Sequence, residues 1–204
     1  MHPNPAFRTT QAQDNLQFAR ARGFGMLCVQ QAPAPLLSHI PFLMSDDLQS
    51  ADLHLVRSNP IVRMVDGATP AVIAVTGADS YISPDWYAID DQVPTWNYVA
   101  VHLHGVLEPL PKEALLDLLD RQSAAYESRL LPKTPWTTGK MTPEARDRMM
   151  RMILPFRFAI DRVEGTWKLG QNKDDAVRFR AAEQVGEHGF GSDAHILAQM
   201  MKDT

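Results

Sequence analysis

The residues of this sequence best suited to hold an anion lie in the segment Arg57-Ser58-Asn59-Pro60. Arg57 stands at the end of a predicted strand, and Asn59-Pro60 predicts a turn directly after it. A guanidinium at such a turn can hold a phosphate through two parallel hydrogen bonds, and neighbouring backbone N–H groups can add donors. We therefore expect Arg57 to be a phosphate anchor, assisted by Asn59 and by Ser58.

His102 and His104 have a spacing that could begin a metal site. Two residues apart in a predicted strand, they share one face, with their imidazoles about 7 Å apart. No third ligand follows at a recognisable spacing. We therefore expect no metal, and we interpret the two histidines as part of a polar strand face or as hydrogen-bonded interior residues.

Motifs of the common enzyme classes are absent from the chain. The sequence contains no Walker loop, no G-x-G-x-x-G turn, no G-x-S-x-G elbow, no H-E-x-x-H and no C-x-x-C. Gly189-Phe190-Gly191 lacks the third glycine of a nucleotide-binding turn and is predicted to be a linker. No side chain stands out as a general acid or base, so no catalytic residue is assigned.

Composition indicates an ordinary globular protein, with 204 residues, of which 45% are hydrophobic and 22% charged. The net charge of −4 does not favour nucleic acid, and no helix-turn-helix is recognisable, so direct DNA binding is not expected. The single cysteine, Cys28, suits a reducing compartment and is expected in the core. Neither a signal peptide nor a membrane span is recognisable, which predicts a cytoplasmic protein.

Hydrophobic alternation and turn residues predict short strands first, helices late, and one closing strand. The expected strands are Phe24–Val29, Leu36–Met44, Ala51–Arg57, Pro70–Thr76, Val99–Leu107 and Phe156–Val163. The expected helices lie between Thr10 and Gly23, at Pro111–Arg129, from Thr142 to before Pro155, at Lys173–Val185 and at Ser192–Lys202. Short strands with few βαβ crossovers favour an antiparallel barrel or sandwich with helical additions.

Five segments, in this order, resemble the PaiB family of FMN-binding negative transcriptional regulators. They are Ser38–Leu43, His54–Pro60, Tyr81–Tyr87, Val93–Tyr98 and Trp167–Asn172. The resemblance runs from about residue 3 to about residue 180. Residues 88–92 form a shorter loop than the family pattern has, which could alter the cover over a cofactor.

The resemblance implies a split β-barrel of the flavin-binding group that includes pyridoxamine phosphate oxidases, with FMN at the interface of a homodimer. A split-barrel domain is then expected at residues 1–172, with a helical insertion at 111–154 and a helical C-terminal tail at 173–204. The tail could pack on a partner subunit or fray.

The matched segments also supply the remaining candidates for an FMN site, which needs a phosphate anchor, edge donors and acceptors, and aromatic walls. Lys168 could meet the phosphate, with Gln171 and Asn172 as hydrogen-bonding partners. His39, Tyr81 and Ser83 could line the ring or the ribityl chain, and equally be core and turn residues. Trp96, Asn97 and Tyr98 suit the rim of a flat heteroaromatic ligand, and equally the packing of a dimer. The alternative for Lys168 and Asn172 is a solvated cation and a helix cap.

Three function classes follow from the resemblance. The first is a non-enzymatic flavin-binding repressor that acts indirectly, because no DNA-reading element is present. The second is an NAD(P)H-dependent flavin reductase or other FMN-dependent oxidoreductase, since the same scaffold hosts such activities. The third is a haem-binding relative, or a barrel that has lost its ligand and serves as an interaction module. His39, His54, His102 and His104 keep haem binding open.

Overall fold

A computed structural model describes residues 1–204 and shows a mainly antiparallel β protein with helical additions. The strands are β1 (Phe24–Val29), β2 (Leu36–Met44), β3 (Ser50–Val56), β4 (Thr69–Ile82), β5 (Thr95–Pro109) and β6 (Ile153–Lys168). They pair in the order β1-β2-β3-β6-β5-β4, and β4 pairs with β1, which closes the barrel. The predicted fold class is confirmed.

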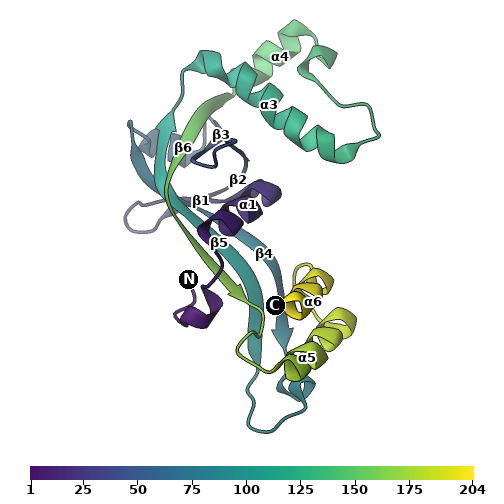
Figure 1. Ribbon diagram of the computed structural model, residues 1–204. Helices are drawn as coiled ribbons and strands as arrows, with labels where there is room; N and C mark the ends of the chain where they lie inside the picture. The colour runs from purple at the N-terminus through teal and green to yellow at the C-terminus, as the bar shows by residue number, and fades with distance from the viewer. The chain divides into compact units, whose positions relative to one another are not determined.

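Helices lie before, between and after the strands (Figure 1). The α-helices are α1 (Ala12–Arg22), α2 (Pro60–Met64), α3 (Leu115–Glu127), α4 (Pro143–Met150), α5 (Asp175–His188) and α6 (Ala194–Asp203). The 3-10 helices are η1 (Pro5–Phe7), η2 (Pro84–Tyr87), η3 (Lys112–Ala114), η4 (Ser128–Leu130) and η5 (Thr138–Lys140). The helices α3 and α4 form an insertion between β5 and β6. None of the helices is both long and apolar enough to span a bilayer.

Two compact units divide the chain. One, here called the N/C unit, consists of residues 1–15, 75–102 and 164–204. The other, here called the insertion unit, consists of residues 16–74 and 103–163. Strands β4, β5 and β6 each contribute residues to both units.

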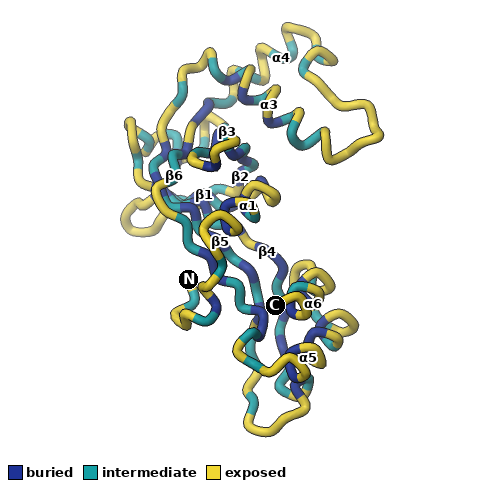
Figure 2. The backbone as a smooth tube through the Cα atoms, in the orientation of Figure 1, coloured by how far each residue is buried: buried dark blue, intermediate teal, exposed yellow.

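The core of the insertion unit follows from strand alternation. In β1 the alternate residues Leu27 and Val29 are buried, whereas Phe24 is exposed and Met26 and Cys28 are half-buried. Cys28 therefore lies on the outward face of β1, and its predicted core position is wrong. Dark segments along the strands in Figure 2 mark the buried residues. The largest fully buried side chains of this unit include Leu27, Phe42, Leu53, Ile61, Ile73, Leu103, Leu107, Leu118, Phe156 and Phe158.

A network of one carboxylate and two guanidinium groups joins β3, β6 and α3 within the insertion unit. Arg157 binds both carboxylate oxygens of Asp52, at 2.8 and 3.0 Å, and Arg121 Nη2 binds Asp52 Oδ2 at 2.9 Å. The Asp52 side chain is only 5% exposed, whereas both arginines are nearly half exposed. Burial raises the pKa of Asp52, but hydrogen bonds and charge from the two arginines outweigh burial and hold its pKa below the ordinary value.

The C-terminal helices pack within the N/C unit. Buried side chains of α5 and α6 include Ala181, Ala182, Val185, Leu197 and Met201. The tail is therefore a packed part of this unit.

The segment between α5 and α6 is bound to β4. Ser80 Oγ donates to the carbonyl of Phe190 at 3.0 Å, and the Asp79 N–H donates to the carbonyl of Ser192 at 2.8 Å. A side-chain carbon on Gly191 would approach the Asp79 carbonyl oxygen to 2.4 Å. Close packing on β4 therefore fixes this segment, which links α5 to α6 as predicted.

Strand β4 is longer than its sequence indicates. The predicted strand ends at Thr76, and the turn-type residues Gly77, Asp79 and Ser80 follow it. In the structure the strand continues to Ile82, and both Ser80 and Ile82 are fully buried. The bonds from Asp79 and Ser80 to the tail supply partners that local propensity cannot anticipate.

Substitution of Asp52 by Asn is expected to lower the free energy of unfolding at pH 7 by about 1–3 kcal/mol, because it leaves two arginines without their carboxylate. The folded pKa of Asp52 lies below its unfolded value, so this stabilisation is present above the unfolded pKa and is lost as pH falls through the folded pKa. Denaturant unfolding of both proteins from pH 7 to pH 3 should show the difference shrinking below about pH 4.

Asp117→Asn is the matched control, because Asp117 also binds Arg121 but its side chain is 72% exposed. Its effect should stay within about 0.5 kcal/mol. A difference between Asp52→Asn and the wild type that is independent of pH would contradict the assigned role of Asp52.

Candidate functional site

The predicted site residues lie in two groups, one in each unit. The first group, in the insertion unit, contains His39, Arg57, Ser58 and Asn59. The second group, in the N/C unit, contains Tyr81, Ser83, Trp96, Asn97, Tyr98, Lys168, Gln171 and Asn172.

Arg57 follows β3 directly and is fixed at two points to the residues after α4. Its backbone N–H donates to the carbonyl of Met152 at 2.9 Å, and its Nε donates to the carbonyl of Arg151. The side chain is exposed, and its two terminal nitrogens, Nη1 and Nη2, have no hydrogen-bond partner in the protein. Arg57 is thus held in place with its outer donors available to a ligand.

A cavity of about 260 Å³ lies beside Arg57. Its lining consists of Arg57, Lys112, Leu115, Asp147, Met150, Arg151 and Ile153. Three of these residues are cationic and one is a carboxylate, so the lining has an excess of two positive charges. Asp147 is in addition paired with Arg146 at 3.3 Å. We call this the cationic cavity.

Sequence reasoning missed Lys112 and Arg151. They lie at the two ends of the helical insertion, far from Arg57 along the chain. Pairing of the two strands could have shown their proximity to Arg57, because Val56 at the end of β3 pairs with Ile153 at the start of β6. An antiparallel pairing of these two predicted strands would have brought the residues before Ile153 to the Arg57 turn.

Asn59 shapes the turn that follows Arg57. Its Oδ1 accepts a hydrogen bond from the Ile61 N–H at 3.0 Å and so caps α2, and its Nδ2 donates to Ser38 Oγ at 2.9 Å. The neighbouring Ser58 is exposed. His39 on β2 is exposed as well and stacks on Phe24, with ring centroids 6.3 Å apart. Asn59 therefore ties the Arg57 turn to β2.

Tyr81 and Trp96 of the second group form an aromatic cluster with Phe190. Phe190 stacks on Tyr81 at a centroid distance of 5.6 Å and meets Trp96 edge-on at 5.8 Å. Trp96 Nε1 donates to Asp79 Oδ1 at 3.2 Å. Trp96 and Phe190 are 40% and 60% exposed, so the cluster presents an open aromatic surface. The sequence predicts Phe190 only as part of a linker, so its place in this cluster is not foreseen.

Asn97 lies beneath α6 and is 1% exposed. Its Nδ2 lies 3.6 Å from Met201 Sδ. Tyr98 is half-buried, and Ser83 caps η2 without a hydrogen bond from its side chain. In this conformation Asn97 is a packing residue that α6 covers.

Lys168 at the end of β6 already has contacts within the N/C unit. Its Nζ donates to Thr95 Oγ1 and to the carbonyl of Trp96, and it lies 5.8 Å from the centre of the Phe7 ring. Burial lowers the pKa of Lys168. Gln171 closes the turn after β6, accepting from the Leu169 N–H and donating to the Trp167 carbonyl, and Asn172 is exposed. Their predicted role toward phosphate stays a prediction.

His102 and His104 are half-buried on β5, at alternate positions of the strand as the spacing predicts. The Glu164 carboxylate lies within 4.8 Å of the His102 imidazole, a proximity that sequence reasoning missed.

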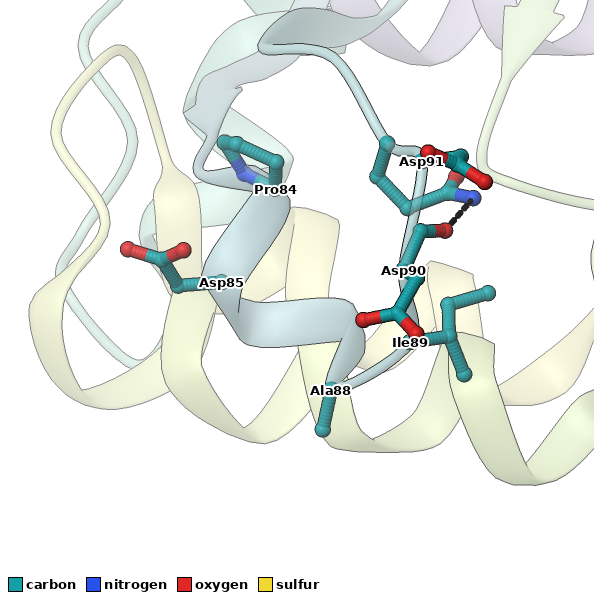
Figure 3. A pocket seen from close by; sticks show the side chains of 7 residues that line it. Pro84, Asp85, Ala88, Ile89, Asp90 and Asp91 are labelled. Carbon is teal, nitrogen blue, oxygen red and sulfur yellow. Dashed lines mark hydrogen bonds between the residues drawn. The ribbon is translucent and has the colours of Figure 1, made fainter.

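Figure 3 shows a second cavity, of about 490 Å³, formed by the loop from Pro84 to Gln92. Asp85, Asp90 and Asp91 line it, and the dashed line marks the hydrogen bond from Gln92 Nε2 to the Asp90 carbonyl at 3.0 Å. The loop includes residues 88–92, the stretch predicted to be shorter than the family pattern. Because its charged side chains are acidic, it does not suit a phosphate group.

Solved structures share the fold at low sequence identity. A FAD and haem binding protein from Mycobacterium smegmatis aligns with 91% of this chain and 82% of its own at a TM-score of 0.59 and 16% identity. A flavocytochrome from Azotobacter vinelandii aligns with 90% of this chain and 77% of its own at a TM-score of 0.56 and 10% identity.

The sequence itself is similar to a sporulation protein and matches a family model. It is 27% identical over 199 residues to protease synthase and sporulation protein PAI 2 of Bacillus subtilis, an alignment that covers 97% of this chain and 94% of the relative. The family model described as "Putative FMN-binding domain" matches residues 1–162. The resemblance to the PaiB family and the expectation of FMN as the cofactor are thereby confirmed, and the chain belongs to this FMN-binding family.

Proposed function

We propose that this FMN-binding protein is a regulator of the PaiB type, in which the Arg57 turn holds the flavin phosphate and FMN occupancy alters the interaction with a partner. The observation that carries the proposal is the state of Arg57. Its Nε and backbone N–H are bound to carbonyls, its outer nitrogens have no protein partner, and the residue lines a cavity with an excess of two positive charges.

A phosphate monoester carries nearly two negative charges at pH 7, which matches this excess. The cavity of the loop from Pro84 to Gln92 has the opposite charge, and the ammonium group of Lys168 is bound to Thr95 and Trp96. Fixing a guanidinium before the ligand arrives also lowers the entropic cost of binding. The Arg57 turn is thus favoured as a phosphate site over the loop cavity and over Lys168.

The flavin ring needs apolar or aromatic walls. The exposed ring of His39 on β2 stacks on the exposed ring of Phe24 on the neighbouring β1, and Asn59 ties β2 to the Arg57 turn through Ser38. We propose that the ring side of FMN lies along this part of β2. Tyr81 and Trp96 remain further predicted flavin contacts.

We propose further that the protein is a homodimer, as the PaiB resemblance implies. The exposed apolar side chains of the N/C unit support this proposal. Val93 is 73% exposed, and Trp96 and Phe190 form an open aromatic surface. Exposed aromatic residues are enriched at the centres of protein interfaces.

Regulation by this protein is proposed to be indirect. The net charge of −4 gives no general attraction to DNA. The relative from Bacillus subtilis is named for protease synthesis and sporulation. FMN binding would then set whether the partner is engaged.

Arg57→Ala is expected to weaken FMN binding by about 1.5–3 kcal/mol, because a charge-assisted phosphate contact is lost. Fluorescence titration of the flavin measures this change. Riboflavin, which lacks the phosphate, is the control ligand and should bind the variant and the wild type equally. An unchanged FMN affinity would remove Arg57 from the site.

Indirect regulation predicts that Arg57→Ala relieves repression of a responsive promoter in cells, while the purified wild-type protein does not retard the same promoter fragment. Gel-shift assays at about 150 mM salt, with and without FMN, measure the second part. Specific retardation by the purified protein would show that it reads DNA directly and would contradict the proposal.

A further inference from the structure

The helical insertion brings two more cations to the Arg57 turn, and neither belongs to a motif of the sequence. Lys112 is in η3, just before α3, and Arg151 directly follows α4. Both side chains are exposed, and neither has a hydrogen bond or ion pair from its charged group within the protein. With Arg57 they line the cationic cavity.

We infer that Lys112 and Arg151 complete an oxyanion pocket with Arg57, and that this pocket makes the protein selective for phosphorylated flavin over riboflavin. The inference rests on the proposed function, because it takes Arg57 as the anchor of the FMN phosphate. Lys112 and Arg151 are then two further binding residues. The helical insertion supplies these cations, which bind the phosphate of a ligand held at the barrel.

Electrostatics favours an anion as the occupant. Three cations around a cavity of about 260 Å³ repel one another, and the one carboxylate of the lining, Asp147, is shared with Arg146. A dianion in the cavity would replace this repulsion with attraction. Leu115, Met150 and Ile153 form the apolar remainder of the lining, which lowers the local dielectric and strengthens the attraction.

The backbone also fixes the pocket independently of the two side chains. Arg57 Nε is held by the carbonyl of Arg151, and the Arg151 N–H donates to the carbonyl of Asp147 at 3.2 Å. Replacing the Arg151 side chain by alanine therefore leaves the acceptor of Arg57 in place. Lys112→Ala and Arg151→Ala remove charge from the cavity and keep the position of Arg57.

The test is a fluorescence titration of FMN and riboflavin at constant ionic strength, on wild type, Lys112→Ala, Arg151→Ala and Arg148→Ala. Arg148 is an exposed arginine of α4 outside the lining and serves as the matched control. Each of the two pocket variants should bind FMN about tenfold or more weakly, whereas riboflavin binding should stay within about twofold. Arg148→Ala should match the wild type with both ligands. Retained riboflavin binding shows that the variants are folded.

Competition by inorganic phosphate distinguishes the flavin phosphate from another phosphorylated ligand. If the pocket binds the flavin phosphate, inorganic phosphate should compete with FMN for the wild-type protein. The same phosphate should not compete with FMN for the Lys112→Ala/Arg151→Ala double variant. Phosphate binding that depends on the two cations but does not compete with FMN would overturn the assignment to flavin.

The titrations separate this inference from the proposed function. FMN affinity that falls in Arg57→Ala but is unchanged in Lys112→Ala and Arg151→Ala would overturn the inference and leave Arg57 as the anchor. FMN affinity unchanged in all three variants would overturn both.

Discussion

The buried carboxylate of Asp52 is the interaction on which the arrangement around the Arg57 turn depends. It joins Arg157 of β6 and Arg121 of α3 to β3, so it fastens the helical insertion to the sheet. Arg57, five residues further on, is bound to the carbonyls of Arg151 and Met152 at the other end of the same insertion. The position of Lys112 at one end and of Arg151 at the other follows from these two attachments.

The charges around Asp52 are neutralised within the protein, whereas those of the cationic cavity are not. Burying Asp52 is costly, and two arginines that remain nearly half exposed offset the cost without being removed from water. The cations of the cationic cavity have no such partner, and their mutual repulsion is a cost that folding alone does not relieve. Structural charges are neutralised within the chain, whereas the cavity leaves charges for a ligand.

Much of the fold could be predicted from local sequence. Phe24–Val29 and Leu36–Met44 were predicted with the bounds that β1 and β2 have, because turn residues flank a clear apolar run. Strands β4, β5 and β6 are longer than predicted. In β4 the reason is visible, since Asp79 and Ser80 favour a turn locally and are held in the strand by residues 190 and 192. Contacts from so far along the chain leave no local signal.

The candidate site was predicted unevenly for the same reason. Arg57 could be found because the turn after it is encoded by its neighbours Asn59 and Pro60. Lys112 and Arg151 could not be found from a local pattern, since Arg151 lies 94 residues from Arg57. Asn97 has the chemistry of a ligand-binding amide, and only the structure shows that α6 covers it.

The position of the phosphate is the central claim, and a crystal structure of the protein with FMN bound tests it most directly. We expect the phosphate within hydrogen-bonding distance of the Arg57 guanidinium, in the cavity shared with Lys112 and Arg151, and the flavin between two copies of the chain. A phosphate bound at Lys168 and Gln171, with no density beside Arg57, would contradict it.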